Sequence, residues 1–157
     1  MSRRLPIVSD VAARPIGLGQ ELLLIGSGGA CGALARASAS GLLAGGAGAA
    51  LAATQVVNLA GAFALGLLLA RLETTGPRPR LRAFLAVGAL GSFTTYSTLV
   101  ADAQRWAGSA GVTGRSLLFV GLSLALGVAA FSLAGVAHRA HRARAADRTG
   151  PANGEAR

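Results

Sequence analysis

Lysine is missing from this 157-residue chain, and acidic residues are scarce. Six acidic residues stand against fifteen arginines, so the formal net charge is +9, yet only 13% of the residues are charged. Hydrophobic residues make up 52% of the chain, and the mean hydropathy is +0.55. The arginines lie at the chain ends and between apolar runs, which is typical of membrane flanks. The sequence therefore predicts a membrane protein and argues against a nucleic-acid partner.

The residue types that most enzyme sites need are also few. The single cysteine, Cys31, excludes an intrachain disulfide and a thiolate metal cluster. His138 and His141 lack the acidic and cysteine partners of a metal site, so we expect them at the surface. No serine–histidine–aspartate or cysteine–histidine pattern is present. We predict that the chain is not an enzyme.

One glycine-rich stretch resembles part of a nucleotide site. The sequence LLLIGSGGAC at residues 22–31 looks like the start of a dinucleotide-binding fingerprint, but Cys31 replaces the third glycine. No acidic residue follows about twenty positions later, and the chain lacks alternating strands and helices. A soluble oxidoreductase is therefore disfavoured.

Four apolar segments predict four transmembrane helices. They cover residues 22–35, 49–70, 83–101 and 116–137. The first is short because Arg36 interrupts or ends it. Loops are expected at residues 40–48, 73–82 and 108–114. We predict an all-α membrane protein with a disordered basic lead (1–19), a four-helix transmembrane domain (20–138) and a disordered basic tail (139–157).

The third apolar segment is weakened at its own centre. Glycines and hydroxyl residues crowd there, namely Gly88, Gly91, Thr94, Thr95, Ser97 and Thr98. Glycine costs a helix about 1 kcal/mol relative to alanine, and serine and threonine hydroxyls compete for backbone hydrogen bonds. Lipid cannot satisfy the carbonyls that a weakened helix frees. We therefore predict that the third helix is broken near its centre and that this break is the functional centre.

Small residues recur at helical spacing in the first and fourth segments. Gly28, Gly32 and Arg36 follow one another four residues apart, so they share a helix face that a second helix can approach closely. Arg36 is therefore expected to face protein or a water-filled vestibule rather than lipid. Ser123 and Gly127 form a similar small face in the fourth segment, where a serine is more often a packing residue than a functional one.

A single asparagine, Asn58, lies near the middle of the second segment. Gly61, Ala62 and Leu65 share its helix face. A buried asparagine in a membrane helix has two interpretations, an interhelical hydrogen bond worth about 1 kcal/mol or a contact to a ligand. The periodicity of the segment leaves both open.

The arginines are distributed unequally between the two sides of the predicted bundle. The side shared by the two chain ends and the second loop carries Arg3, Arg4, Arg14, Arg71, Arg78, Arg80, Arg82, Arg139, Arg142, Arg144, Arg148 and Arg157. The other side carries Arg36, Arg105 and Arg115, with Trp106 as an interface anchor. By the positive-inside rule both termini are cytoplasmic, in a multi-pass protein of the cell membrane.

The polar groups of the spans are neutral hydrogen-bond donors. Asn58, Ser97, Thr98 and Ser123 carry them, and Tyr96 adds a ring whose edge is positive. Donors without carboxylates suit a small anion, whereas carbonyls freed near Gly91 suit a cation. Glu21, Glu73 and Asp102 fall at segment edges. A proton-coupled exporter, which needs a titrating carboxylate in the membrane, is therefore poorly supported.

Three motifs in order carry a family resemblance. They are GGACGALAR at residues 28–36, TQVVNLAGAF at 54–63 and GALGSFTTYST at 88–98. Together they resemble the CrcB/Fluc fluoride channel family over the chain from about residue 22 to residue 137. The resemblance implies a four-helix subunit, an antiparallel dimer with two fluoride pores and a central structural sodium ion. It also implies passive export of fluoride, which lowers the cytoplasmic fluoride level.

The resemblance also implies roles for individual residues. Backbone carbonyls of Gly91 and Thr94 would bind the sodium ion, and Arg36 would lie at the vestibule. Fluoride in the pore would meet Asn58, Tyr96, Ser97, Thr98, Leu99 and Ser123. This chain departs from the family pattern at Tyr96 and Leu99, where phenylalanine is usual, and at Gly127, where threonine is frequent.

These departures leave the second subunit of the expected dimer open. Leu99 removes one of the aromatic rings that both subunits are thought to contribute to each pore. A strong arginine bias also disagrees with identical chains that insert both ways up. The partner is therefore either a second copy of the chain or an oppositely oriented paralogue. A non-conducting accessory subunit remains an alternative function.

Overall fold

The computed structural model describes residues 16–43, 45, 47–107 and 114–148. Its elements are α1 (Leu18–Leu43), α2 (Ala47–Thr75), α3 (Pro79–Leu81), the π-helix η1 (Arg82–Leu90), α4 (Gly91–Phe93), α5 (Tyr96–Ala107) and α6 (Gly114–Arg148). Every element in these ranges is helical. Four stretches are long and apolar enough to cross a membrane, Leu18–Leu43, Ala49–Thr75, Pro79–Arg105 and Gly114–Asp147. The predicted all-α fold with four spans is confirmed.

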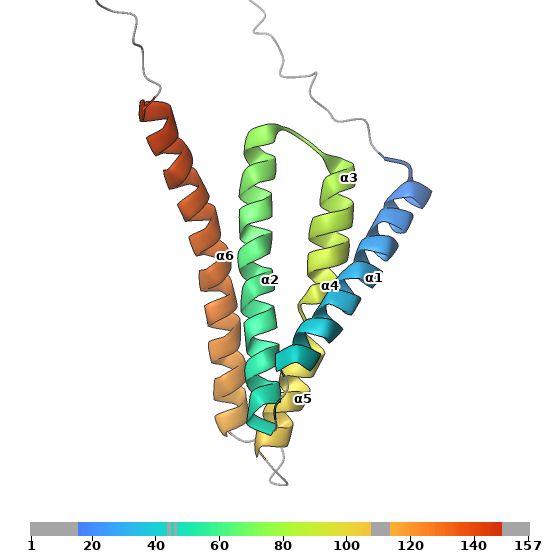
Figure 1. Cartoon of the computed structure of the whole chain (residues 1–157), viewed down its shortest axis with the longest axis vertical. Coiled ribbons are helices and arrows are strands. Elements are labelled where there is room, and N and C mark those ends of the chain that lie inside the picture. Colours follow the sequence, from blue (N-terminus) through green and yellow to red (C-terminus); the bar gives the residue numbers. More distant parts are fainter. Residues whose placement is uncertain (1–15, 44, 46, 108–113, 149–157) are drawn as a thin grey trace, which may run out of the picture.

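The spans are arranged around α2. In Figure 1, α2 lies between α6 and the third span, and α1 leans across the third span. α1 packs chiefly along η1, and α6 packs chiefly along α2. Beyond the break, α5 packs against α2 and α6. The third span therefore changes its main helix partner at the break.

The outer surface of the bundle is apolar and its buried core is small. The buried hydrophobic residues are mostly alanines, and Val57 is the largest fully buried side chain. Large leucines face outward instead, among them Leu23 and Leu42, the latter 88% exposed. Lipid tails solvate such side chains as well as a protein interior does. The chain is therefore a multi-pass membrane protein.

The glycine face predicted on α1 brings two backbones together. Gly28 and Gly32 are both buried against η1. A Cβ atom on Gly32 would collide with the backbone carbonyl of Ala89, and one on Gly28 would collide with that of Phe84. Gly88 in η1 makes the reciprocal close contact, because a Cβ atom on it would lie 2.6 Å from the Ile25 carbonyl oxygen. Each of these contacts requires a glycine on one of the two helices, because a Cβ atom at that position would overlap the facing backbone.

The contact between α2 and α6 is closest at Gly66 of α2. A Cβ atom on Gly66 would collide with the backbone carbonyl of Phe131. At Gly127, which shares its helix face with Ser123, an added Cβ atom would meet nothing within 4 Å. The small face formed by Ser123 and Gly127 therefore borders open space at Gly127, and no other described helix packs against that position.

Two helix boundaries differ from the predicted ones. The loop predicted at residues 40–48 shrinks, because α1 continues to Leu43 and α2 begins at Ala47. The tail predicted to be disordered from residue 139 is helical up to Arg148. Alanine and arginine dominate residues 138–148, and both are strong helix formers. The fourth helix therefore continues beyond the end of the apolar segment at residue 137. Residues 1–15, 108–113 and 149–157 lie outside the described residues.

The predicted break in the third span is confirmed. The helix ends at Phe93, and Thr94 adopts an extended conformation with φ −78° and ψ 150°. Helix resumes at Tyr96. The π-helical winding of η1, which is separated from the break by the short helix α4, was not expected from the sequence. Such wide turns frequently occur beside functional sites.

The glycine contacts make a direct stability prediction. Gly32→Ala places a methyl group against the Ala89 carbonyl, so we expect it to lower the free energy of unfolding by about 1–3 kcal/mol. Gly26→Ala is the matched control on the same helix, because a Cβ atom at Gly26 meets nothing within 4 Å. It should be neutral or slightly stabilising. Denaturant unfolding in detergent, followed by circular dichroism, measures both, and equal stability of the two variants would contradict the close packing.

Candidate functional site at the helix break

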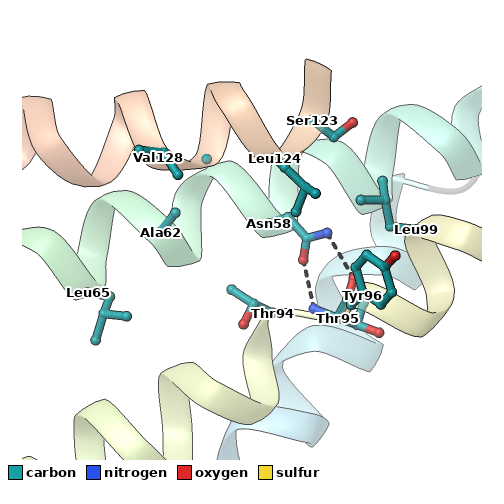
Figure 2. Close-up of a pocket in the computed structure, with 11 residues that line it drawn as sticks. Asn58, Ala62, Leu65, Thr94, Thr95, Tyr96, Leu99, Ser123, Leu124 and Val128 are labelled. Carbon is teal, nitrogen blue, oxygen red and sulfur yellow. Dashed lines mark hydrogen bonds between the residues drawn. The ribbon is translucent and has the colours of Figure 1, made fainter. Parts of the chain in front are cut away.

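Asn58 of α2 braces the break by bonding the backbone of Thr95 twice. Its Oδ1 accepts a hydrogen bond from the Thr95 amide at 2.7 Å, and its Nδ2 donates to the Thr95 carbonyl at 3.0 Å. Figure 2 shows the amide directed from α2 onto the break. In a continuous α-helix the Thr95 amide would donate to the Gly91 carbonyl. Asn58 therefore replaces a helical hydrogen bond and holds the helix open.

The Thr95 side chain starts the helix that follows. Its Oγ1 accepts a hydrogen bond from the Thr98 amide at 3.2 Å, which makes Thr95 the N-cap of α5. The same hydroxyl donates to Thr98 Oγ1 at 3.0 Å and lies 3.3 Å from Ser97 Oγ. Three hydroxyl groups thus form one cluster at the first turn of α5.

Arg36 reaches the other side of the break from α1. Its Nε donates to the backbone carbonyl of Ser92 at 3.1 Å, in the short helix α4. The residue is half-buried. The prediction that Arg36 faces protein rather than lipid is confirmed. Because Ser92 is capped from α1 and Thr95 from α2, the freed backbone of the break is held by side chains from two neighbouring spans.

A cavity of about 320 Å³ lies beside the break, between α2, α5 and α6. Its lining residues are Asn58, Ala62, Leu65, Thr94, Thr95, Tyr96, Leu99, Ser123, Leu124, Gly127 and Val128. None of them is charged at neutral pH. Figure 2 shows Asn58, Thr94, Thr95 and Tyr96 gathered at the break with Leu99 and Leu124 beside them, whereas Ala62, Leu65 and Val128 lie toward the other end. The cavity is therefore a mostly apolar chamber with a cluster of neutral polar groups at the break.

Only part of the predicted pore set meets at this cavity. Asn58, Tyr96, Leu99 and Ser123 line it, together with Thr94. The other predicted residues, Arg36, Gly91, Ser97 and Thr98, are absent from the lining. Ser97 and Thr98 belong instead to the hydroxyl cluster of Thr95.

The side chains at the cavity differ in what they offer to an ion. Tyr96 is 63% exposed, whereas Leu99 is buried with 2% exposed. Ser123 is buried and its hydroxyl donates to the Phe119 carbonyl at 2.8 Å, one turn earlier in its own helix. Asn58 keeps one of its two N–H donors beyond the bond to Thr95. The Asn58 amide therefore lines the cavity with one N–H that the Thr95 backbone does not use.

One turn beyond Leu99 lies the carboxylate of Asp102. The sequence analysis placed this residue at the edge of a segment, whereas the structure buries it. Asp102 is 6% exposed. Its Oδ2 accepts a hydrogen bond from the buried Thr54 hydroxyl at 2.7 Å, and its Oδ1 pairs with the largely exposed Arg105 at 2.6 Å. Asp102 therefore ties α5 to α2 while one of its oxygens faces a cation. Trp106 follows in α5, but its side chain lies outside the described residues.

Sequence reasoning found the break but missed the N-cap role of Thr95 and the bond between Thr54 and Asp102. Thr95 was named only as one of several helix-weakening residues, although a threonine directly before a helix is a typical N-cap. The bond between Thr54 and Asp102 joins residues 48 positions apart, so no local spacing could indicate it.

Four spanning helices define a small multi-pass membrane protein. Its third span is broken against Asn58, and a cavity lined by neutral groups lies at the break. The family model described as "CrcB-like protein, Camphor Resistance (CrcB)" matches residues 23–136. The chain belongs to this family. No solved structure matches the chain significantly.

Several curated relatives carry the name fluoride-specific ion channel. A FluC 2 protein of Leifsonia xyli is 39% identical over 128 residues, which cover 76% of this chain and 83% of the relative. A FluC 2 protein of Thermobifida fusca is 40% identical and covers 81% of this chain and 94% of the relative. A FluC protein of Thermus thermophilus is 40% identical and covers 69% and 87%.

The brace at the break predicts a local effect of removing Asn58. Asn58→Ala strips both bonds from the Thr95 backbone, and each unpaired buried group costs about 1–3 kcal/mol. We expect faster hydrogen exchange of the amides at residues 94–98, measured by mass spectrometry in detergent. Gln55→Ala, one turn earlier in α2, is the control, because the Gln55 Oε1 atom has no hydrogen-bond partner among the described residues. Unchanged exchange in Asn58→Ala would show that the break holds without the brace.

Proposed function

We propose that the chain forms a fluoride-selective channel through which fluoride leaves the cytoplasm passively, so that intracellular fluoride falls. The neutral, donor-bearing cavity at the helix break is the observation that carries this proposal. Membership of the CrcB-like family and relatives named fluoride-specific ion channels support it. The proposal makes the chain a transport protein rather than an enzyme.

The chemistry of the cavity suits a small anion. Fluoride is the strongest hydrogen-bond acceptor of the halides, so it needs donors to replace its water. A carboxylate at the cavity would repel it, and none lines the chamber. The remaining N–H of Asn58 and the hydroxyl and ring edge of Tyr96 are the donors closest to the break. Ser123 contributes once its hydroxyl rotates from the Phe119 carbonyl.

The other residues of the predicted pore set act around the cavity in this proposal. Ser97 and Thr98 extend the line of hydroxyls along α5 beyond Thr95. Arg36 supplies a positive charge on the far side of the break, where it attracts an anion toward the vestibule. Leu99 adds no donor, so it makes the pathway narrower and drier at that point.

We further propose a structural sodium ion at the break. The donor set fits a hard cation, because the Thr95 amide leaves the Gly91 carbonyl for Asn58, and Thr94 turns its backbone out of the helix. The Ser92 carbonyl is already taken by Arg36. Two carbonyls, from Gly91 and Thr94, do not fill the coordination shell of sodium. In our proposal, matching carbonyls from a second subunit complete the shell.

That second subunit completes an antiparallel dimer in our proposal. Tyr96 is largely exposed although it lines the cavity, as expected for a pore that a neighbour closes. The partner is either a second copy or a paralogue of opposite orientation. The arginine bias favours the paralogue, because it fixes the orientation of this chain. In that case the chain is an obligate heterodimer subunit. The pore that contains Leu99 then conducts less fluoride than the second pore of the dimer.

The cavity predicts which side chains govern transport. Ser123→Ala should lower the rate of fluoride efflux from liposomes by about twofold to tenfold, the value of one hydrogen bond. Ser132→Ala is the matched control, because that serine is exposed on the same helix. A fluoride electrode reads the efflux and a chloride electrode reads selectivity, in whichever assembly conducts. Equal rates for the two variants would exclude Ser123 from the path.

The dimer proposal predicts how transport depends on composition. We expect the chain alone to give low efflux, and co-reconstitution with an oppositely oriented paralogue to restore it. Replacing sodium with N-methylglucamine throughout should lower efflux further if the ion is structural. A chain that conducts alone and cross-links to itself in antiparallel orientation would contradict the heterodimer. Folded but silent protein in both preparations would favour the accessory subunit.

A further inference from the structure

The fourth helix is longer than a membrane span requires. α6 has 35 residues, which at the α-helical rise correspond to about 52 Å. The hydrocarbon core of a bilayer is about 30 Å thick. Residues 116–137 carry no charge and alone cover the core. Residues 138–148, which we call the α6 extension, therefore project from the membrane as a continuous helix.

The α6 extension is basic, and its described arginine side chains are exposed. Four arginines and one aspartate give it a net charge of +3 with the histidines neutral, which is four minus one. Arg139, Arg142 and Arg144 are all exposed. After Val136 the extension contains no large apolar side chain, so it has no face with which to lie flat in the interface. It instead stands upright, with its first turns at the depth of the lipid headgroups.

The neighbouring elements add charge of the same sign. Figure 1 places the end of α2 and the start of the third span at the same end of the molecule as the α6 extension. Exposed arginines there are Arg71, Arg78, Arg80 and Arg82. Of the described acidic residues at this end, Glu73 already faces Arg139 at 4.0 Å. Positive charge therefore dominates this end of the bundle.

We propose that this end, with the α6 extension as its principal part, binds the headgroups of anionic phospholipids in the adjacent leaflet. Guanidinium groups pair with phosphate through two parallel hydrogen bonds. A basic residue at an anionic membrane surface gains affinity that decays within a Debye length, about 8 Å at physiological ionic strength. Arg139 and Arg142 fall inside that distance, because the helix leaves the hydrocarbon at residue 138. This depth favours a lipid over a soluble anion.

The proposal is tested with a fluorophore on the α6 extension of the full-length chain. Ala143 is exposed between the arginines, and Cys31 is the only native thiol. Ala143→Cys with Cys31→Ser therefore gives one labelling site. The labelled protein is reconstituted in phosphatidylcholine vesicles with an equal, small fraction of spin-labelled phosphatidylglycerol or spin-labelled phosphatidylcholine. We expect the anionic quencher to be at least about threefold more effective at low salt and the difference to shrink at high salt.

Charge variants test whether the arginines of the α6 extension cause the preference for the anionic lipid. Arg139→Gln, Arg142→Gln and Arg144→Gln together should abolish the preference, whereas the three lysine substitutions should keep most of it. Arg115→Gln, at the opposite end of α6, should change nothing. Equal quenching by both lipids at low salt, or a preference that survives the three glutamines, would overturn the proposal. Displacement by inorganic phosphate at constant ionic strength would also overturn it. None of these readings depends on fluoride transport.

Discussion

The pair of hydrogen bonds between Asn58 and the backbone of Thr95 is the constraint on which the rest of the site depends. Lipid offers no partner for an amide or carbonyl released from a helix. The third span can therefore break inside the membrane only if a neighbour supplies both a donor and an acceptor at one point. Asparagine does so with a short side chain. Once the break is held, Thr95 can cap α5, and α5 can turn toward α2 and α6 and border the cavity.

The close glycine contacts between α1 and η1 also hold the break in the third span. Gly28 and Gly32 let α1 lie backbone to backbone against η1. That proximity places the Arg36 Nε atom 3.1 Å from the Ser92 carbonyl oxygen in α4. Packing of α1 and bonding of the break are therefore coupled, because a wider helix contact would move the guanidinium away from its acceptor. The two halves of the third span are fixed by different neighbours, α1 before the break and α2 with α6 after it.

The polar groups of the spans divide into those that hold the structure and those left for an ion. Thr95, Thr98, Ser97 and Arg36 are engaged with each other or with the backbone. Asp102 is engaged with Thr54 and Arg105. What faces the cavity is neutral and has few unused donors, which suits an anion that must enter and leave readily. The membrane surface, in contrast to the neutral cavity, is strongly charged. Exposed arginines gather at one end of the molecule, where they bind the lipid headgroups.

The sequence by itself determined the four spans, the break in the third and the small face of α1. These follow from hydropathy, glycine content and helical periodicity, all of which are local. It also indicated that Arg36 avoids lipid. Only the tertiary structure decided that Asn58 bonds to Thr95, that Ser97 and Thr98 belong to a cap cluster, and that Asp102 is buried against Thr54. Those pairings join residues 37 and 48 positions apart or depend on where a helix restarts. The packing of separate helices fixes them, and no spacing within one segment encodes that packing.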